Sequence, residues 1–179
     1  MTACPTLHTE RLVLRPFTDD DVAPYAATLQ AAEVRAALHL GDTVTEDDAW
    51  FQMAAFLGQW ALRGTGQWAL EERATGRFVG RAGLHNPHRA SWPGIEVGWT
   101  LHPDAWGQGY ATEAGDAAVA YGFDVLELDE LVSVILHENA RSQAVARRLG
   151  FTPAEEQVLA HFPSMPHVVW RLRREDWTG

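Results

Sequence analysis

The stretch WTLHPDAWGQGYATEA, from Trp99 to Ala114, decides how this 179-residue chain is interpreted. It places Gly107 and Gly109 in a turn that leads into a segment whose small and apolar residues have helical spacing, from about 109 to 123. Glycine has no Cβ, so the backbone of such a turn can approach a bound group closely. The N–H groups at the start of the helix then favour an anion. Taken alone, the same two glycines also suit a tight turn that binds nothing.

Two better-known glycine-rich motifs fit this turn poorly. A dinucleotide fingerprint needs a third glycine where the chain has Thr112, and it needs direct strand-to-turn contact where residues 102–106 intervene. A P-loop needs Gly-Lys followed by Ser or Thr, and all 14 basic residues here are arginine. The sequence therefore favours a phosphate or pyrophosphate of a long cofactor at this turn.

Composition indicates one globular domain that spans residues 1–179. Hydrophobic residues make up 46% of the chain and charged residues 21%. The net charge of −10 argues against a nucleic-acid partner and slightly favours a cationic substrate. No apolar run is long enough for a membrane span, and the first residues lack the pattern of a signal peptide, so we expect a cytoplasmic protein without a membrane partner.

The only cysteine, Cys4, cannot form an internal disulfide. It precedes the first predicted element and has no defined partner nearby, so we do not expect it to be a catalytic nucleophile.

The hydrophobic patterns predict an α+β (mixed α/β) fold with about seven strands and about four helices. Capping signals at residues 18–21 and 45–48 start two helices that end near Leu38 and Arg63. Gly150 ends the last helix. The predicted strands span 11–17, 67–73, 77–84, 95–101, 131–136, 156–161 and 167–173, and the later helices span 109–123 and 138–149. This order of elements predicts a mixed, mostly antiparallel sheet.

Four segments, in the expected order and spacing, resemble the GNAT N-acetyltransferases, and within them the RimJ/RimL-like branch of ribosomal-protein alanine N-acetyltransferases. Together they cover nearly the whole chain from Leu7 to Trp177. The segments are LHTERLVLRPFTDDD (7–21), GRFVGRAGL (76–84), WTLHPDAWGQGYATEA (99–114) and ENARSQAVARRLGF (138–151). The resemblance implies the GNAT fold, in which strand 97–101 splays away from strand 131–136 and acetyl-CoA, the co-substrate, lies in the gap. It implies no metal.

The resemblance also assigns the residues that contact coenzyme A. Backbone N–H groups of 106–112 would hold the pyrophosphate, strand 97–101 would lie beside the pantetheine arm, and Asn139 would hydrogen-bond to that arm. Arg147 or Arg148 is a candidate for the nucleotide phosphates. The complete set is Val97, Gly98, Trp99, Thr100, Leu101, Trp106, Gly107, Gln108, Gly109, Tyr110, Ala111, Thr112, Asn139 and Ser142.

The chain departs from the family pattern at two positions. Trp106 stands where the general pattern begins the loop with Gln or Arg, which leaves a loop that binds through its backbone intact. Ala146 stands where many members carry a tyrosine that protonates the leaving thiolate. Ser142 is the alternative at the cofactor sulfur, either as the acid or in a positioning role.

Glu96 is the candidate general base, because an amine substrate is mostly protonated near neutral pH and must lose a proton before it attacks. Alternation along the strand places Ile95, Val97 and Trp99 on one face and Glu96 with Gly98 on the other. That polar face suits a cleft, but it also suits a solvent-exposed surface. The oxyanion donor is expected to be a backbone N–H near Gly98.

Histidines supply two tentative acceptor-site residues, His85 and His137. His85 and His88 have loose metal-ligand spacing but no third ligand nearby, so no metal site is expected. The aromatic residues of the second predicted helix, which have helical spacing, are interpreted as core: Trp50, Phe51, Phe56 and Trp60.

The sequence therefore predicts an enzyme that transfers acetyl from acetyl-CoA directly to a primary amine, either a protein N-terminus or a small molecule. Because Cys4 offers no credible nucleophile, no covalent enzyme intermediate is expected. The alternative is a catalytically silent acyl-CoA-binding regulatory or partner-binding protein, which Ala146 favours. A dinucleotide oxidoreductase is a distant third. The sequence does not indicate the oligomeric state.

Overall fold

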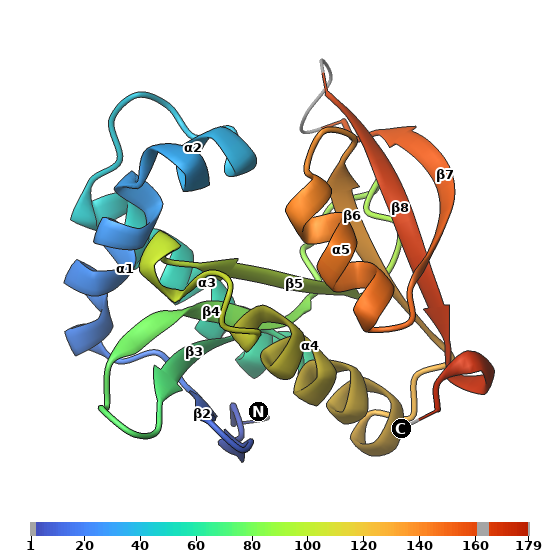
Figure 1. Cartoon of the computed structure of the whole chain (residues 1–179), viewed down its shortest axis with the longest axis horizontal. Coiled ribbons are helices and arrows are strands. Elements are labelled where there is room, and N and C mark those ends of the chain that lie inside the picture. The colour runs from blue at the N-terminus through green and yellow to red at the C-terminus, as the bar shows by residue number, and fades with distance from the viewer. Residues whose placement is uncertain (1–2, 161–164, 179) are drawn as a thin grey trace.

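The computed structural model describes residues 3–160 and 165–178, and its strands form one eight-stranded mixed sheet. The sheet order is β1-β2-β3-β4-β5-β6-β8-β7 (Figure 1). Among the described strands, β5 and β6 alone pair in parallel, and the other neighbours are antiparallel. The strands are β1 Leu7–His8, β2 Leu12–Arg15, β3 Gln67–Glu72, β4 Phe78–His85, β5 Glu96–Leu101, β6 Glu130–Leu136, β7 Thr152–Val158 and β8 Pro166–Arg173. The predicted mixed α+β class is confirmed.

The described part of the chain also contains five α-helices. They are α1 Val22–Gln30, α2 Ala32–Leu38, α3 Glu46–Arg63, α4 Tyr110–Ala120 and α5 Ala140–Arg148. The capping signal at Thr45 forms a complete capping box with Asp48, and α3 ends at Gly64 in the left-handed conformation. Gly150, with φ 88°, likewise follows the end of α5.

The helix predicted from residue 18 to Leu38 is wrong as a continuous element. Ala31 adopts ψ 130°, which ends α1 and starts α2 in a new direction. The break allows Val34 to pack in the same buried cluster as Tyr25 and Leu29. Burial, rather than a local sequence signal, therefore explains the interruption.

The strand predicted at 156–161 begins earlier, since β7 spans Thr152–Val158, and the end of that prediction, His161, lies outside the described residues. Almost every residue of β7 is exposed, so the strand carries no inside-outside alternation that a pattern could reveal. β1 has only two residues and was likewise not predicted.

Two apolar clusters occupy the two faces of the sheet. One joins buried residues of β2–β6 and β8 to α4 and α5 and includes Trp60 of α3, and the other lies between the sheet and α1–α3. The core interpretation is right for Phe56 and Trp60, which are buried, and wrong for Trp50 and Phe51, which are 48% and 67% exposed. The buried stripe of α3 runs through Ala49, Met53, Phe56 and Trp60, which leaves positions 50 and 51 on the outer side.

None of the described helices is long and apolar enough to cross a membrane.

Candidate active site

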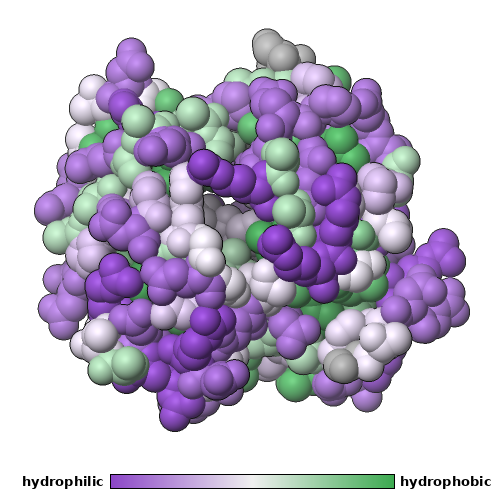
Figure 2. Space-filling view, in the orientation of Figure 1, coloured by the Kyte–Doolittle hydropathy of each residue, from purple (hydrophilic) through white to green (hydrophobic). Residues whose placement is uncertain are grey.

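A cleft opens where β5 and β6 separate. These strands share a single paired position, Glu96 opposite Val132, with the Val132 N–H donating to Ile95 O at 3.0 Å. Beyond that point residues of both strands line a cavity of about 2330 Å³, together with α2, α3, the start of α4 and α5. Figure 2 shows the hollow between the two halves of the molecule, with hydrophilic residues at its rim. Ordinary small-molecule pockets are about 300–1,000 Å³, so this cleft has room for an extended ligand and a second substrate.

The glycine turn forms the cleft wall at the start of α4. Gly107 and Gly109 have φ of 75° and 84°, the left-handed conformation that glycine adopts at little cost. The N–H groups of residues 107–112 have no recorded acceptor in the described part of the chain, and Gly109 offers no side-chain cap. The first full helical bond in α4 comes from Glu113 N–H to Gly109 O. These free donors at a helix N-terminus fit a pyrophosphate.

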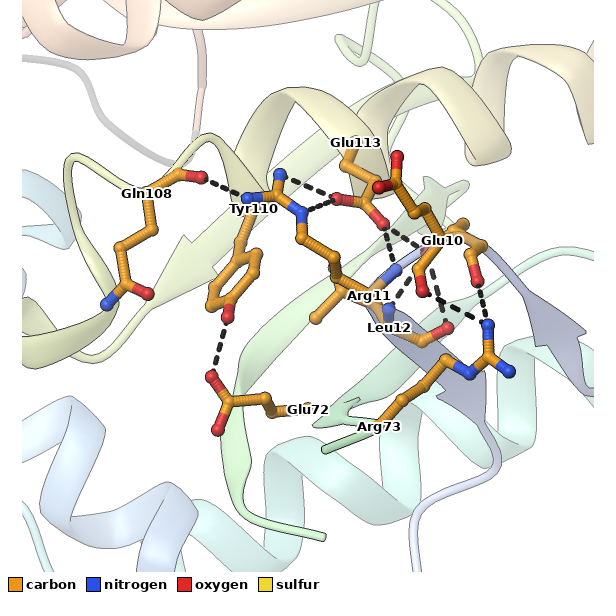
Figure 3. A network of polar contacts seen from close by, with 9 residues as sticks. Glu10, Arg11, Leu12, Glu72, Arg73, Gln108, Tyr110 and Glu113 are labelled. Carbon is orange, nitrogen blue, oxygen red and sulfur yellow. Dashed lines mark hydrogen bonds and ion pairs between the residues drawn. The ribbon is translucent and has the colours of Figure 1, made fainter. Parts of the chain in front are cut away.

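Arg11, the residue before β2, fixes the position of this turn (Figure 3). Its guanidinium donates to Gln108 O at 2.8 Å and to the Glu113 carboxylate at 2.7 Å. The guanidinium also lies 4.9 Å from the centre of the Tyr110 ring, and the Tyr110 hydroxyl donates to Glu72 at 2.6 Å. Arg11 was not predicted from the sequence, because its partners lie about one hundred positions away and no local pattern relates them.

Most residues predicted to contact coenzyme A line this cleft. The lining includes Gly98, Trp99, Thr100, Leu101, Trp106, Gly107, Gly109, Tyr110, Ala111, Thr112, Asn139 and Ser142. Val97 is fully buried in the core on the other face of β5. Gln108 is not part of the lining, and its side chain donates to Asp104 O at 3.1 Å.

Glu96 lies at the closed end of the cleft, where β5 and β6 separate. The pKa of its carboxyl is raised from 4.5 to about 7, because the effect of burial outweighs the contributions that lower it. The lowering contributions come from the Val134 N–H at 3.4 Å and from the charges of Arg81 and Arg89. A Cβ on Gly98 would lie 3.7 Å from Glu96 Oε1, so Glu96 and Gly98 share one face of β5 as the alternation predicts. This face lines the cleft and is not a solvent-exposed surface.

Asn139 and Ser142 lie together at the N-terminus of α5. The Asn139 Oδ1 caps the helix by accepting from Ser142 N–H at 3.1 Å, while no hydrogen bond of the Ser142 hydroxyl is recorded among the described residues. Ala146 is fully buried in the core and does not line the cleft. Of the two arginines considered for phosphates, Arg148 lines the cleft, and Arg147 lies 5.0 Å from the centre of the Trp170 ring.

The structure separates the two histidines proposed for the acceptor site. His85 pairs with Glu96 across β4 and β5 and lines the cleft, and burial lowers its pKa to about 3, so it is neutral at pH 7. His137 is exposed, lies 3.5 Å from Glu156 and does not line the cleft. Burial raises the pKa of the Cys4 thiol to about 12, which disfavours the thiolate that a nucleophile needs. The described residues contain no cluster of three or more metal-ligating side chains.

This region also contains three residues that were not predicted from the sequence: Gln67, Arg81 and Tyr25. Gln67 and Arg81 line the cleft, and the Tyr25 hydroxyl accepts a hydrogen bond from Arg81 at 2.9 Å. The sequence offered one signal, a polar residue in each of two apolar strands. From strand alternation alone, such residues are predicted to face solvent.

Comparison with known proteins agrees with this architecture. The FsC-acetyl coenzyme A-N(2)-transacetylase of Aspergillus fumigatus is 31% identical over 188 residues, covering 98% of this chain and 79% of that protein. The crystal structure of an acetyltransferase from Agrobacterium tumefaciens matches with TM-score 0.78 and 32% identity, covering 97% of this chain and 96% of that one. A protein of Vibrio cholerae described as a ribosomal-protein-serine acetyltransferase matches with TM-score 0.75 and 26% identity, covering 97% and 99%.

The family model described as "Acetyltransferase (GNAT) domain" matches residues 11–152. The eight-stranded sheet, with its two central parallel strands spread apart, is the GNAT fold predicted from the glycine turn and its flanking segments. This chain belongs to the GNAT family of acetyltransferases.

Proposed function

We propose that this protein transfers the acetyl group of acetyl-CoA directly to a primary amine. The observation that carries the proposal is the position of Glu96: a carboxylate with pKa about 7 lies where β5 and β6 separate, in the same cleft as the uncapped start of α4. The first feature suits proton transfer from an amine, and the second suits a pyrophosphate.

Glu96 is the general base in this proposal. A primary amine has a pKa of roughly 8 to 10 and is mostly protonated at neutral pH. A base with a pKa near the working pH is ionised often enough to accept the proton and basic enough to hold it. The raised pKa of Glu96 meets both conditions at about pH 7–8, which an ordinary glutamate with pKa 4.5 does not.

Backbone N–H groups of β5 supply the oxyanion donor. Because Ile95 O accepts from β6, the odd-numbered residues of β5 turn their backbone groups toward β6. Trp99 lies beyond the single paired position, so its N–H faces the cleft and not a neighbouring strand. A donor at that position stabilises the negative charge that develops on the thioester oxygen during attack.

The Ser142 hydroxyl positions the departing sulfur, and its high intrinsic pKa makes it a weak acid. We therefore expect Ser142→Ala to lower kcat less than about tenfold, the scale of one lost hydrogen bond, with acetyl-CoA affinity within about threefold of wild type. Steady-state kinetics and calorimetry measure both quantities. A thousandfold loss of kcat would show that Ser142 is the proton donor that replaces the tyrosine absent at position 146.

The RimJ/RimL-like branch is the subfamily we infer, supported by the four sequence segments and by the likeness to the Vibrio cholerae protein. The name of that branch suggests a protein N-terminal amine as the acceptor. A small-molecule amine is the other source of the same chemistry, and the relative from Aspergillus fumigatus is named for transfer to a nitrogen.

The test titrates acetyl-CoA into the purified protein by calorimetry and then follows release of free coenzyme A thiol with a panel of amines on the same sample. We expect binding together with acceptor-dependent thiol release. Binding without turnover on any amine would overturn the enzyme proposal in favour of the silent acyl-CoA-binding protein. Absence of binding would overturn the assignment of the glycine turn as well.

A further inference from the structure

The acceptor pocket, defined here as the part of the cleft between Glu96 and helices α1–α3, has a polar floor made by one face of β3, β4 and β5. The strand register places three cross-strand pairs in a row: Arg81 with Thr100, Gly83 with Gly98 and His85 with Glu96, and it places Gln67 of β3 beside Gly83. Gly83 and Gly98, the middle pair, have no side chains and leave space above this face of the sheet. A small molecule lying over them would have Arg81 at one end and Glu96 at the other.

Arg81 is held in place by neutral groups. Its Nε donates to the Tyr25 hydroxyl at 2.9 Å, and its Nη1 donates to Gln67 Oε1 at 2.9 Å. The Tyr25 hydroxyl in turn donates to Gln52 Oε1 at 2.9 Å, and the guanidinium lies 5.1 Å from the centre of the Phe56 ring. These contacts hold the guanidinium in position without neutralising its positive charge.

No carboxylate of the described residues lies within ion-pair distance of Arg81, and no partner of its Nη2 is recorded among them. Arg15 shows the usual arrangement in the same sheet, since it pairs with Asp21 at 2.7 Å and with Glu71 at 2.8 Å. A half-buried arginine is normally neutralised in this way. The unneutralised charge of Arg81 in a cleft therefore indicates an anionic group of a ligand.

Two buried polar atoms on the same floor also lack partners in the described structure, Gln67 Nε2 and Thr100 Oγ1. Gln67 is completely buried, and its Oε1 is committed to Arg81, which orients Nε2 away from the arginine. Nε2 would lie 3.7 Å from a Cβ on Gly98, the same distance as Glu96 Oε1. Unpaired buried donors are costly, so this donor points to an oxygen acceptor that the ligand brings.

The charges nearest Glu96 are positive, whereas the net charge of the chain is negative. Arg81 and Arg89 both line the cleft and lower the pKa of Glu96 and of His85. His85 stays neutral, with Nδ1 facing Gln59 Nε2 at 3.3 Å. The net charge of −10 slightly favoured a cationic substrate, whereas the local charge of this pocket favours a substrate that carries an anion.

We propose that Arg81 and Gln67 bind a carboxylate of the acceptor, so that the substrates are amino-acid-like amines that carry a carboxylate close to the reacting nitrogen. The proposal rests on the proposed function and deepens it. One carboxylate oxygen accepts a hydrogen bond from Arg81 Nη2 and the other accepts one from Gln67 Nε2, and the amine then lies over Gly98 toward Glu96. A protein N-terminus has an amide where this carboxylate would be, so it leaves Arg81 unneutralised.

The experiment compares matched pairs of acceptors by thiol release at saturating acetyl-CoA. The pairs are glycine with methylamine, leucine with isoamylamine and phenylalanine with phenethylamine, and phenylalaninamide and a C-terminally amidated alanine tripeptide represent the amide case. We expect at least one amino acid to exceed its matched amine and the amides in kcat/KM by about 30-fold or more, the scale of one charge-assisted hydrogen bond.

Arg81→Met tests the assignment to this side chain. We expect it to reduce kcat/KM for the preferred amino acid by about 30-fold or more relative to kcat/KM for the matched amine, so that the ratio of the two values falls. Because the charge of Arg81 also lowers the pKa of Glu96, kcat/KM for both acceptors can shift together, and the ratio is the quantity that tests the carboxylate site. Unchanged acetyl-CoA affinity in the same variant shows that the cleft remains folded. The control is Arg173→Met, which removes the same charge from an exposed position of β8 outside the cleft. It should leave kcat/KM unchanged both for the preferred amino acid and for the matched amine. Arg81→Lys keeps the positive charge but loses the planar guanidinium that Tyr25 and Gln67 hold in position, and it should recover part of the preference for the amino acid.

Equal kcat/KM for amino acids and matched amines, or a faster reaction with the amides, would overturn this inference while leaving the acetyltransferase intact. An equal loss for both acceptor classes in Arg81→Met would do the same. If no amine supports turnover, calorimetry of N-acetylphenylalanine with the coenzyme A complex decides: binding that Arg81→Met abolishes supports the carboxylate site, and no binding overturns it.

Discussion

Gly109→Val should abolish acetyl-CoA binding while the protein still folds. Gly109 is the residue before α4 and has φ 84°, so a valine there adopts a conformation that L-residues avoid. Its Cβ would lie 3.3 Å from Arg11 Nη2, a tight contact with the guanidinium that holds the turn, so we expect the substitution to displace the free N–H groups proposed to bind the anion. We expect Kd to rise at least about 100-fold, because each lost charge-assisted hydrogen bond costs about 1.5–3 kcal/mol. Calorimetry measures the change.

Gly76→Val is the matched control for the backbone strain. Gly76, in the turn between β3 and β4, has φ 71° and open space around its Cβ position, and it lies outside the cleft. Both variants should lose about 1–2 kcal/mol of unfolding free energy, since both place a side chain at positive φ. Only Gly109→Val should lose acetyl-CoA binding. An unchanged affinity in Gly109→Val would remove the glycine turn from the cofactor site.

The sequence was most informative where local physics decides the structure. The capping box of Thr45, the stop at Gly150 and the glycine turn each depend on residues within one or two turns of chain, and the structure has all three. The break at Ala31 depends on a distant core, so the local helical pattern continued through it. β7 lies at the exposed edge of the sheet, where no apolar alternation exists to mark it.

The candidate site divides in the same way. Glu96 was predicted because strand alternation and a neighbouring glycine are local properties, and the structure places both on the cleft face. Arg81 and Gln67 come from two different strands and meet through register, which a single sequence does not specify. Their partner Tyr25 comes from a helix more than fifty positions earlier than Arg81. The residues of the proposed acceptor pocket therefore meet through tertiary pairing, whereas local pattern was enough to predict the glycine turn and the candidate base Glu96.

Glu96→Gln should reduce kcat by about 10²–10⁴-fold, the usual contribution of a general base, with acetyl-CoA affinity nearly unchanged. In the wild type, kcat/KM should rise with pH through an inflection at about 7, the pKa of Glu96, as well as through the pKa of the amine. The variant should lose the first inflection and keep the second. Glu10→Gln, which alters an exposed carboxylate outside the cleft, is the control and should retain both. Full activity in Glu96→Gln would remove Glu96 from the mechanism.

Stability gives an independent readout of the same variant. The pKa of Glu96 is raised in the folded protein, so the folded state favours the protonated carboxyl. That contribution to stability is complete below the unfolded pKa of about 4.5, and it is lost as the pH rises through about 7. A neutral glutamine carries no such loss. The Tm of Glu96→Gln relative to wild type should therefore increase between pH 5 and pH 8.5, measured by thermal unfolding at matched ionic strength. A Tm difference that does not change with pH would show that Glu96 titrates as an ordinary surface carboxylate, and its proposed role as a base at neutral pH would fall with it.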